Sequence, residues 1–272
     1  MNEVSGPGQA GPLRFELPTR SKTVNRWSRT LWLAILLGVT ALCSWLYLRT
    51  VPMASPAEAL DRGAELLRFR KVLVVVAHPD DAEWYIGGTL RMLANFGAET
   101  HVVVATDGES GPNRVGASDL ASQRRREQLA AAEVNGYSHV YFLGLPDRVA
   151  SNDPNLRGDL IRIWRSVDPD VVLTFDPVFP SLPYLHTDHQ GIGKVVIELR
   201  RSQGFTVPIY LWQTRRPDTA VDISSVLDVK ITALEQHTSQ GLSTGAERHR
   251  PFARRAGSLF GIAYGELLRR LD

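Results

Sequence analysis

The sequence predicts an α/β protein with a Rossmann-like, mostly parallel sheet that is flanked by helices and preceded by one N-terminal transmembrane helix. Two observations predict the sheet. Short β-branched runs that are apolar on both faces recur from residue 71 onward, and stretches with helical spacing lie between them. Strands buried on both faces are typical of parallel sheets covered by helices. With 272 residues, the chain is long enough for one such domain and an appendage.

The pattern locates the elements of this domain. We expect strands at 72–77, 101–106, 139–144, 170–175 and 208–212, and helices at 119–135, 157–167, 189–202 and 224–238. A further helical stretch begins near Gly87 and Gly88. These glycines do not have the G-x-G-x-x-G spacing of a dinucleotide site, so a nicotinamide cofactor is not expected.

Composition limits the possible functions. Apolar residues make up 43% of the chain and charged residues 22%, as in an ordinary globular protein. The net charge of +2 gives no reason to expect nucleic-acid binding. Because Cys43 is the single cysteine, the chain has no internal disulfide and no cysteine-rich zinc site. Any metal ion must be held by His, Asp or Glu.

The N-terminal region predicts a membrane anchor. Residues 31–48 run for 18 positions without a charge, and a helix of that length spans roughly 27 Å, close to the hydrocarbon thickness of a bilayer. A buried core helix and a cleaved signal peptide are the alternatives. Five basic residues lie before the segment, whereas over a similar distance after it there are three, Arg49, Arg62 and Arg68. This bias favours a single-pass protein with a cytoplasmic N-terminus and an extracytoplasmic catalytic domain.

The expected domain organisation follows from these assignments. It is a flexible basic tail at 1–30, a transmembrane helix at 31–48, a linker at 49–70 and the α/β domain, which holds the polar residues discussed next, at 71–272.

Two polar clusters follow strands of the predicted sheet. The first strand runs directly into His78-Pro79-Asp80-Asp81, and the segment from Tyr184 to His189 follows the strand at 170–175. Ligands of open α/β sheets bind beyond the carboxyl ends of the strands. Two histidines and one carboxylate are a common donor set for catalytic zinc, and the same set suits non-haem iron(II), so the identity of the metal stays open.

Several motifs together resemble one known family. AHPDDAEWYIGGTL resembles the AHPDDxE…GGT signature of the LmbE-like, or PIG-L-like, de-N-acetylases. The likeness continues through TDGESG, the segment from Arg124 to Glu127, FLGLPD, HTDH and KITALEQHTSQ, and covers roughly residues 71–270. The family often has HPDH where this chain has HTDH, so Thr187 replaces a proline that is not a ligand.

The resemblance implies a role for each polar residue of the two clusters. The metal ligands would be His78, Asp81 and His189, Asp80 would be the general base, and His186 would stabilise the oxyanion. Tyr184 resembles a tyrosine that lines the site in some members and helps to polarise the carbonyl. From its place in the sequence, we expect Asp188 to orient a neighbouring imidazole, and we expect His186 to carry positive charge when it faces the oxyanion. Known members remove the acetyl group from N-acetylglucosamine conjugates, so the resemblance implies a zinc- or iron(II)-dependent deacetylase with a small or lipid-linked N-acetylated sugar as substrate. The alternatives are a hydrolase of another amide or of an ester, and a membrane-tethered binding protein with an inactive site.

Other polar residues receive structural interpretations. The run Arg124 to Arg126 is expected to be a solvated helix face, with contact to a phosphate or sugar hydroxyl as the alternative. Glu83 is expected to be a first-turn glutamate that the helix dipole stabilises, with contact to the site as the alternative. The segment from His237 to Gln240 is expected to pack a helix against the site rim.

Overall fold

The computed structural model describes residues 26–181 and 186–272. The chain divides into two units, residues 1–47 and 48–272. Helix α1 (Arg26–Leu48) lies in the first unit except for its last residue, and it begins within the tail expected over residues 1–30. The second unit contains the sheet and both polar clusters.

The expected transmembrane helix is not supported. In the part of the chain that the structure describes, no helix is both long enough and apolar enough to cross a membrane. A membrane span needs about 20 apolar residues, and the described side chains of α1 cover residues 30–45.

The second unit is built on a seven-stranded sheet in the order β3-β2-β1-β4-β5-β7-β6. The strands are β1 (Lys71–Val76), β2 (Glu99–Thr106), β3 (His139–Leu145), β4 (Val171–Phe175), β5 (Ile209–Trp212), β6 (Thr219–Asp222) and β7 (Gly265–Leu271). The pairs among β1 to β5 are parallel, which confirms the predicted mostly parallel sheet. Strand β7 runs antiparallel to β5 and β6. Strands β6 and β7 were not expected from the sequence, because β6 has only four residues and the charged side chains of β7 hide its strand pattern.

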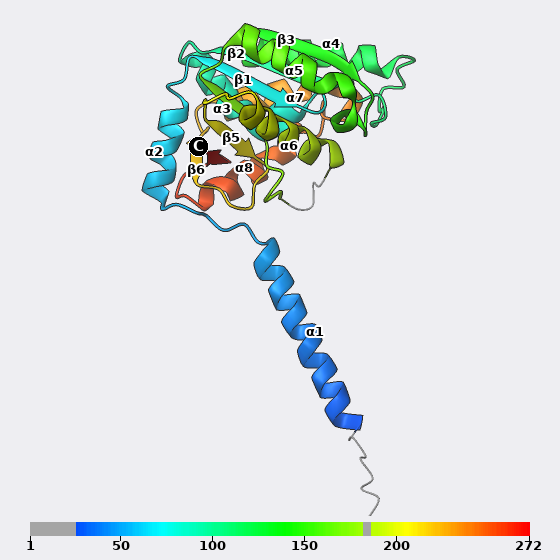
Figure 1. Ribbon diagram of the computed structural model, residues 1–272, viewed down its shortest axis with the longest axis vertical. Coiled ribbons are helices and arrows are strands. Elements are labelled where there is room, and N and C mark those ends of the chain that lie inside the picture. The colour runs from blue at the N-terminus through cyan, green and yellow to red at the C-terminus, as the bar shows by residue number, and fades with distance from the viewer. Residues whose placement is uncertain (1–25, 182–185) are drawn as a thin grey trace, which may run out of the picture. The chain divides into compact units, whose positions relative to one another are not determined.

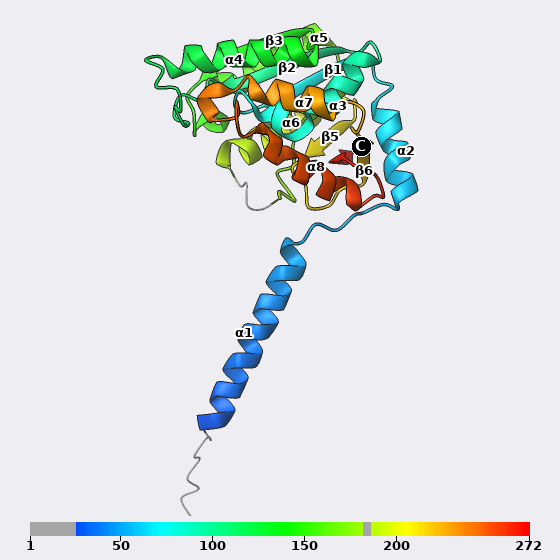
Figure 2. The same ribbon diagram turned by 180° about the vertical axis from the view of Figure 1, so that it is seen from behind.

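Helices cover both faces of this sheet, as the two opposite views show (Figure 1, Figure 2). They are α2 (Pro56–Leu66), α3 (Asp81–Asn95), α4 (Leu120–Asn135), α5 (Pro154–Val167), α6 (Thr187–Ser202), α7 (Leu227–Glu235) and α8 (His249–Ser258). Helices α3, α4 and α7 contact one another on one face, whereas α5 and α6 pack together on the other. Helix α2 lies within the segment expected as a linker, begins in a capping box at Ser55 and packs against β6.

The strand order explains where the polar clusters meet. The chain passes from β1 to β2 and β3 on one side, and then returns to place β4 on the other side of β1. Loops that leave β1 and β4 therefore diverge at the carboxyl edge of the sheet, where open α/β sheets bind ligands. His78 follows β1 and His189 lies in α6 after β4, so this reversal brings together residues more than 100 positions apart.

A buried ion pair supports helix α3 behind that edge. The backbone of α3 is non-helical at Ile86, which frees amide groups within the helix. The N–H groups of Gly88 and Thr89 donate to the two carboxylate oxygens of Glu266 on β7, at 2.9 and 2.6 Å. Lys230 of α7 lies 2.5 Å from the same carboxylate, and both charged side chains are buried.

We expect Glu266→Ala to cost about 3–5 kcal/mol of unfolding free energy, because it leaves the Lys230 charge and two helix N–H groups buried without their partner. Lys230→Met should cost less, since Glu266 would keep both backbone donors. Urea unfolding of the full chain checks this order. Equal costs, or a larger cost for Lys230→Met, would contradict the account of the α3 kink.

His249 predicts a pH dependence of stability. Burial, together with the nearby charges of Lys230 and Arg248, lowers the pKa of His249 to about 3, and its ring packs edge-on against Trp84. Between about pH 6.5 and pH 3, His249 therefore carries a proton in the unfolded chain but not in the folded chain. Stability is fully present above pH 6.5 and falls as the pH is lowered, by up to about 1.4 kcal/mol per pH unit.

We expect His249→Phe to reduce this acid sensitivity in urea unfolding measured from pH 7 to pH 4. The same change at His139, which is an exposed histidine, is the matched control and should leave the slope as it is. A slope that His249→Phe does not alter would contradict the assignment.

Candidate active site

The ring of His78 has carboxylates on both sides. It follows β1 directly and is 7% exposed. Its Nε2 lies 3.0 Å from Asp147 Oδ1 and 3.5 Å from Asp188 Oδ2, while its Nδ1 lies 3.4 Å from Asp81 Oδ2. Burial disfavours the charged ring, but these carboxylates outweigh it and hold the pKa of His78 well above its usual value. Asp147 is the last residue of the FLGLPD motif but was not among the site residues expected from the sequence.

Asp81 connects the two polar clusters. Its Oδ2 accepts a 2.7 Å hydrogen bond from the His78 backbone N–H, and its Oδ1 lies 3.1 Å from His189 Nε2. Burial alone would raise the pKa of Asp81, but the contacts with His189 and His78 hold it well below the usual value. The first residue of α3 is therefore an ionised carboxylate in contact with an imidazole from each cluster.

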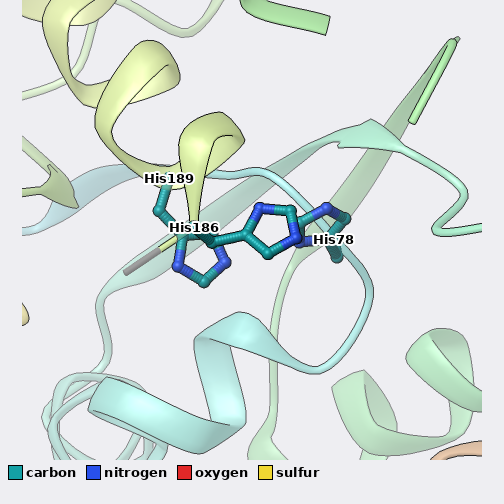
Figure 3. A group of neighbouring side chains, drawn as sticks. All are labelled: His78, His186 and His189. Atoms are coloured by element: carbon teal, nitrogen blue, oxygen red, sulfur yellow. The ribbon is translucent and has the colours of Figure 1, made fainter. Parts of the chain in front are cut away.

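Three imidazole rings gather at this edge of the sheet (Figure 3). The ring centroid of His78 lies 4.7 Å from that of His186 and 5.4 Å from that of His189. His189 stacks on Phe175, the last residue of β4, with ring centroids 4.1 Å apart. Helix α6 approaches β4 closely at Gly193, where the lack of a side chain permits the contact: a Cβ there would lie 2.3 Å from the Phe175 carbonyl oxygen. Close packing of helix and strand thus fixes the position of the His189 ring.

Asp80 is held in an unusual conformation beside these rings. Its φ of 104° lies in a region that L-residues rarely adopt. Its backbone N–H donates to Gln128 Oε1 at 3.0 Å, and Arg124 lies 3.4 Å from its carboxylate. Burial raises the pKa of Asp80, against the opposing effect of Arg124. A raised pKa makes this carboxylate a better proton acceptor than an ordinary aspartate.

The expected solvated face at Arg124 to Arg126 is wrong for its first member. Arg124 is buried and donates to the carbonyl oxygens of Gly108 and Pro79. Arg125 pairs with Asp107, and Arg126 is exposed and contacts Gln123. The run therefore places one arginine under the site and leaves the other two outside it.

The second cluster is only partly described. Tyr184 lies outside the described residues, so its predicted role stays a prediction. His186 is partly exposed and precedes α6, and Asp188 Oδ2 lies 3.9 Å from its Nδ1 and 3.5 Å from His78 Nε2. Burial and the neighbouring rings of His78 and His189 lower the pKa of His186. These interactions favour a neutral ring, not the positive charge expected from the sequence, and a neutral imidazole still donates one N–H.

A buried polar chain supports Asp80 from behind. Gln128, which accepts from the Asp80 N–H, donates to Glu83 Oε1 at 3.1 Å, and Glu83 Oε2 lies 3.2 Å from His237 Nε2. Glu83 is fully buried, so the interpretation of a first-turn residue that serves the helix dipole is incomplete. Glu127 accepts hydrogen bonds from Ser239 and Thr238, and so links α4 to the segment from His237 to Gln240.

A pocket of about 310 Å³ opens over this arrangement. Its lining includes residues of both clusters and of three loops: His78, Asp80, Ser110, Gly111, Pro112, Arg124, Asp147, Arg148, His186 and Gln240. The reacting part of a substrate in this pocket would lie beside Asp80, His78 and His186.

The donors fit a metal ion in more than one grouping. Ligand atoms of His78, His186 and His189 lie within 4.8 Å of one another, as do those of His78, Asp147 and Asp188. Asp81 contacts His78 and His189 at 3.4 and 3.1 Å. Tetrahedral ligands bonded at about 2.0–2.1 Å lie roughly 3.3 Å apart, and each of these two pairs has about that spacing, through Asp81 Oδ2 for His78 and through Oδ1 for His189.

Comparisons with known proteins agree with this arrangement. The family model described as PIG-L, GlcNAc-PI de-N-acetylase, matches residues 73–199. A probable N-acetyl-alpha-D-glucosaminyl L-malate deacetylase 2 of Bacillus cereus is 30% identical over 63% of this chain and 84% of its own length.

Two solved structures extend the likeness to the fold. The N,N'-diacetylchitobiose deacetylase of Pyrococcus horikoshii has a TM-score of 0.69 at 29% identity, covering 75% of this chain and 84% of its own. The 4-carboxy-2-hydroxymuconate hydratase of Pseudomonas putida has a TM-score of 0.65 at 28% identity, covering 75% and 96%.

The fold and the site define an α/β protein with a His/Asp cluster at the carboxyl edge of a mostly parallel sheet. The chain belongs to the PIG-L family, as the resemblance of its motifs predicts.

The two carboxylates on either side of His78 should differ in their effect on metal affinity. We expect Asp81→Asn to abolish stoichiometric zinc binding, because it removes a donor that contacts both histidines. Asp147→Asn should weaken binding by about 10–100-fold, the usual effect of losing a partner that orients a ligating imidazole. Competition titration with a chromophoric chelator measures both, with circular dichroism as a check on folding. The reverse order would favour the donor set of His78, Asp147 and Asp188.

Proposed function

We propose that this chain hydrolyses the N-acetyl amide of an N-acetylglucosamine-type conjugate, with a divalent metal ion held by His78, Asp81 and His189. The observation that carries the proposal is the position of the Asp81 carboxylate, 3.4 Å from His78 Nδ1 and 3.1 Å from His189 Nε2, directly beside Asp80. These groups supply a metal-binding set next to Asp80, a proton acceptor that lines the pocket together with His78.

The partners of His78 support this ligand set over the others. An imidazole usually gives one nitrogen to a metal and donates from the other to a carboxylate. His78 Nε2 already lies 3.0 Å from Asp147, which leaves Nδ1, on the Asp81 side, for the ion. The donors suit Zn²⁺ and also Fe²⁺; we propose Zn²⁺ as the resident ion.

The chain's own residues divide the work of amide hydrolysis. A divalent ion held here would polarise the acetyl carbonyl and lower the pKa of water. The Asp80 carboxylate accepts the proton of the attacking water, aided by the raised pKa that burial gives it. It then returns this proton to the amine as the carbon–nitrogen bond breaks. His186 directs an N–H toward the oxygen on which negative charge develops.

The proposed substrate class rests on the relatives. The malate-conjugate and diacetylchitobiose enzymes both act, by their names, on N-acetylated sugars. The hydratase of Pseudomonas putida supports a second candidate, the addition of water to an unsaturated carboxylic acid, because its chain matches over 96% of its length. The metal set and the proton acceptor suit either reaction, so the substrate panel must include both.

The membrane location remains a proposal based on sequence alone. The uncharged segment at 31–48 and the basic residues before it support a single-pass anchor with the catalytic domain outside the cytoplasm. Protease protection in sealed vesicles tests the sidedness: digestion of the catalytic domain from the cytoplasmic side would contradict the proposal.

Zinc- or iron(II)-loaded full chain should release primary amine from N-acetylglucosamine conjugates. We expect Asp80→Asn to lower kcat by about 10²–10⁴-fold, because it removes the proton acceptor. His186→Gln should lower kcat by about 10²–10³-fold through loss of the oxyanion donor. Neither variant should lose the metal, which elemental analysis of the purified protein checks.

His139→Ala, which removes an exposed histidine outside the pocket lining, is the matched control. Amine release that Asp80→Asn does not reduce would overturn the assigned role of Asp80. If no acetylated sugar releases amine and an unsaturated dicarboxylate is hydrated, the hydratase function would replace the deacetylase proposal.

A further inference from the structure

Two arginines line the pocket, and only one of them is committed to the protein. Arg124 is buried, and its guanidinium contacts the Gly108 and Pro79 carbonyls and the Asp80 carboxylate. Arg148 is exposed. Among the described residues, its side chain makes one hydrogen bond, from Nη2 to the Ser110 carbonyl oxygen at 3.0 Å, and no ion pair within 4.0 Å. The pocket therefore carries a cation at its mouth that these residues leave without a counter-charge.

The backbone of Arg148 is fixed by the site. Its N–H lies 2.7 Å from Asp188 Oδ2 and 2.8 Å from Asp147 Oδ1, and donates to both. Both carboxylates also contact His78. This arrangement requires a φ of 72°, the left-handed region that favours glycine and disfavours a bulky side chain. The backbone contacts alone would be served by glycine, and a strained residue at a functional site suggests a use for its side chain.

We propose that Arg148 is a specificity-determining residue that binds an anionic group, a phosphate or a carboxylate, on the part of the substrate next to the N-acetyl sugar. The guanidinium is a planar fork of donors that matches both anions. One of its amino groups is held by the 108–112 loop, so the fork is anchored at the pocket mouth beside the groups proposed to cleave the amide. This inference deepens the proposed function and rests on it.

The test compares neutral and charged probes on the metal-loaded full chain. Three N-acetylglucosamine glycosides are used: a methyl glycoside, one with a phosphodiester aglycone and one with a carboxylate aglycone. We expect the wild type to prefer one or both charged probes. Arg148→Asn removes the charge while tolerating positive φ, and should lower kcat/KM for the preferred charged probe relative to the neutral one by about 10–100-fold. The loss should fall mainly on KM, and Arg148→Lys should restore part of it.

The outcomes separate the two levels of the account. Arg126→Asn, which removes an exposed arginine outside the pocket lining, should leave the ratio of charged to neutral probe unchanged. A preference for the phosphodiester over the carboxylate, or the reverse, identifies the anion. Hydrolysis with the same ratio in wild type and Arg148→Asn, or a parallel loss for all probes that arises in kcat, would overturn this inference alone. If none of the three probes is hydrolysed, both the proposed function and this inference would be overturned.

Discussion

The arrangement of the site depends on the two contacts that the Asp81 carboxylate makes. One oxygen accepts the backbone N–H of His78 and the other contacts the ring of His189, so a single side chain connects the end of β1 with the start of α6. These segments belong to opposite sides of the reversal in strand order. Because Asp81 follows Asp80 directly, the geometry that aligns the histidines also places the Asp80 carboxylate, the proposed proton acceptor, beside them. The proposed metal site, the proposed proton acceptor and the topology of the sheet therefore all depend on one buried carboxylate.

The C-terminal strand supports both halves of this arrangement. Glu266 of β7 binds amide groups at the kink of α3, the helix that begins with Asp81. Farther along β7, Arg269 makes a bidentate ion pair with Asp176, which follows β4. Buried charges that are fully paired hold a structure rigid, whereas half-paired ones are costly. Strand β7 thus stabilises α3 and the residue that directly follows β4, although none of its own residues lines the pocket.

Much of this could be predicted from sequence, because the parallel strands and the polar clusters have local patterns. Runs such as VLVVVA are buried on both faces, and a loop of polar residues after such a strand is poorly explained by packing. Strand β7 could not be predicted, since its GELLRRL pattern gives charged side chains whose partners lie far away in the chain. Asp147 and Arg148 were missed for a related reason: their importance comes from contacts with His78 and Asp188, made across loops. The buried state of Arg124 likewise depends on the Gly108 and Pro79 carbonyls, which sequence cannot place.

Anomalous diffraction from crystals of the zinc-loaded chain, recorded on both sides of the zinc absorption edge, tests the central claim most directly. The account predicts a single peak between His78 Nδ1, the Asp81 carboxylate and His189, with Asp80 beside it but not bound to it. A peak on the other side of the His78 ring, among Nε2, Asp147 and Asp188, would contradict the assigned ligands and, with them, the role given to Asp81.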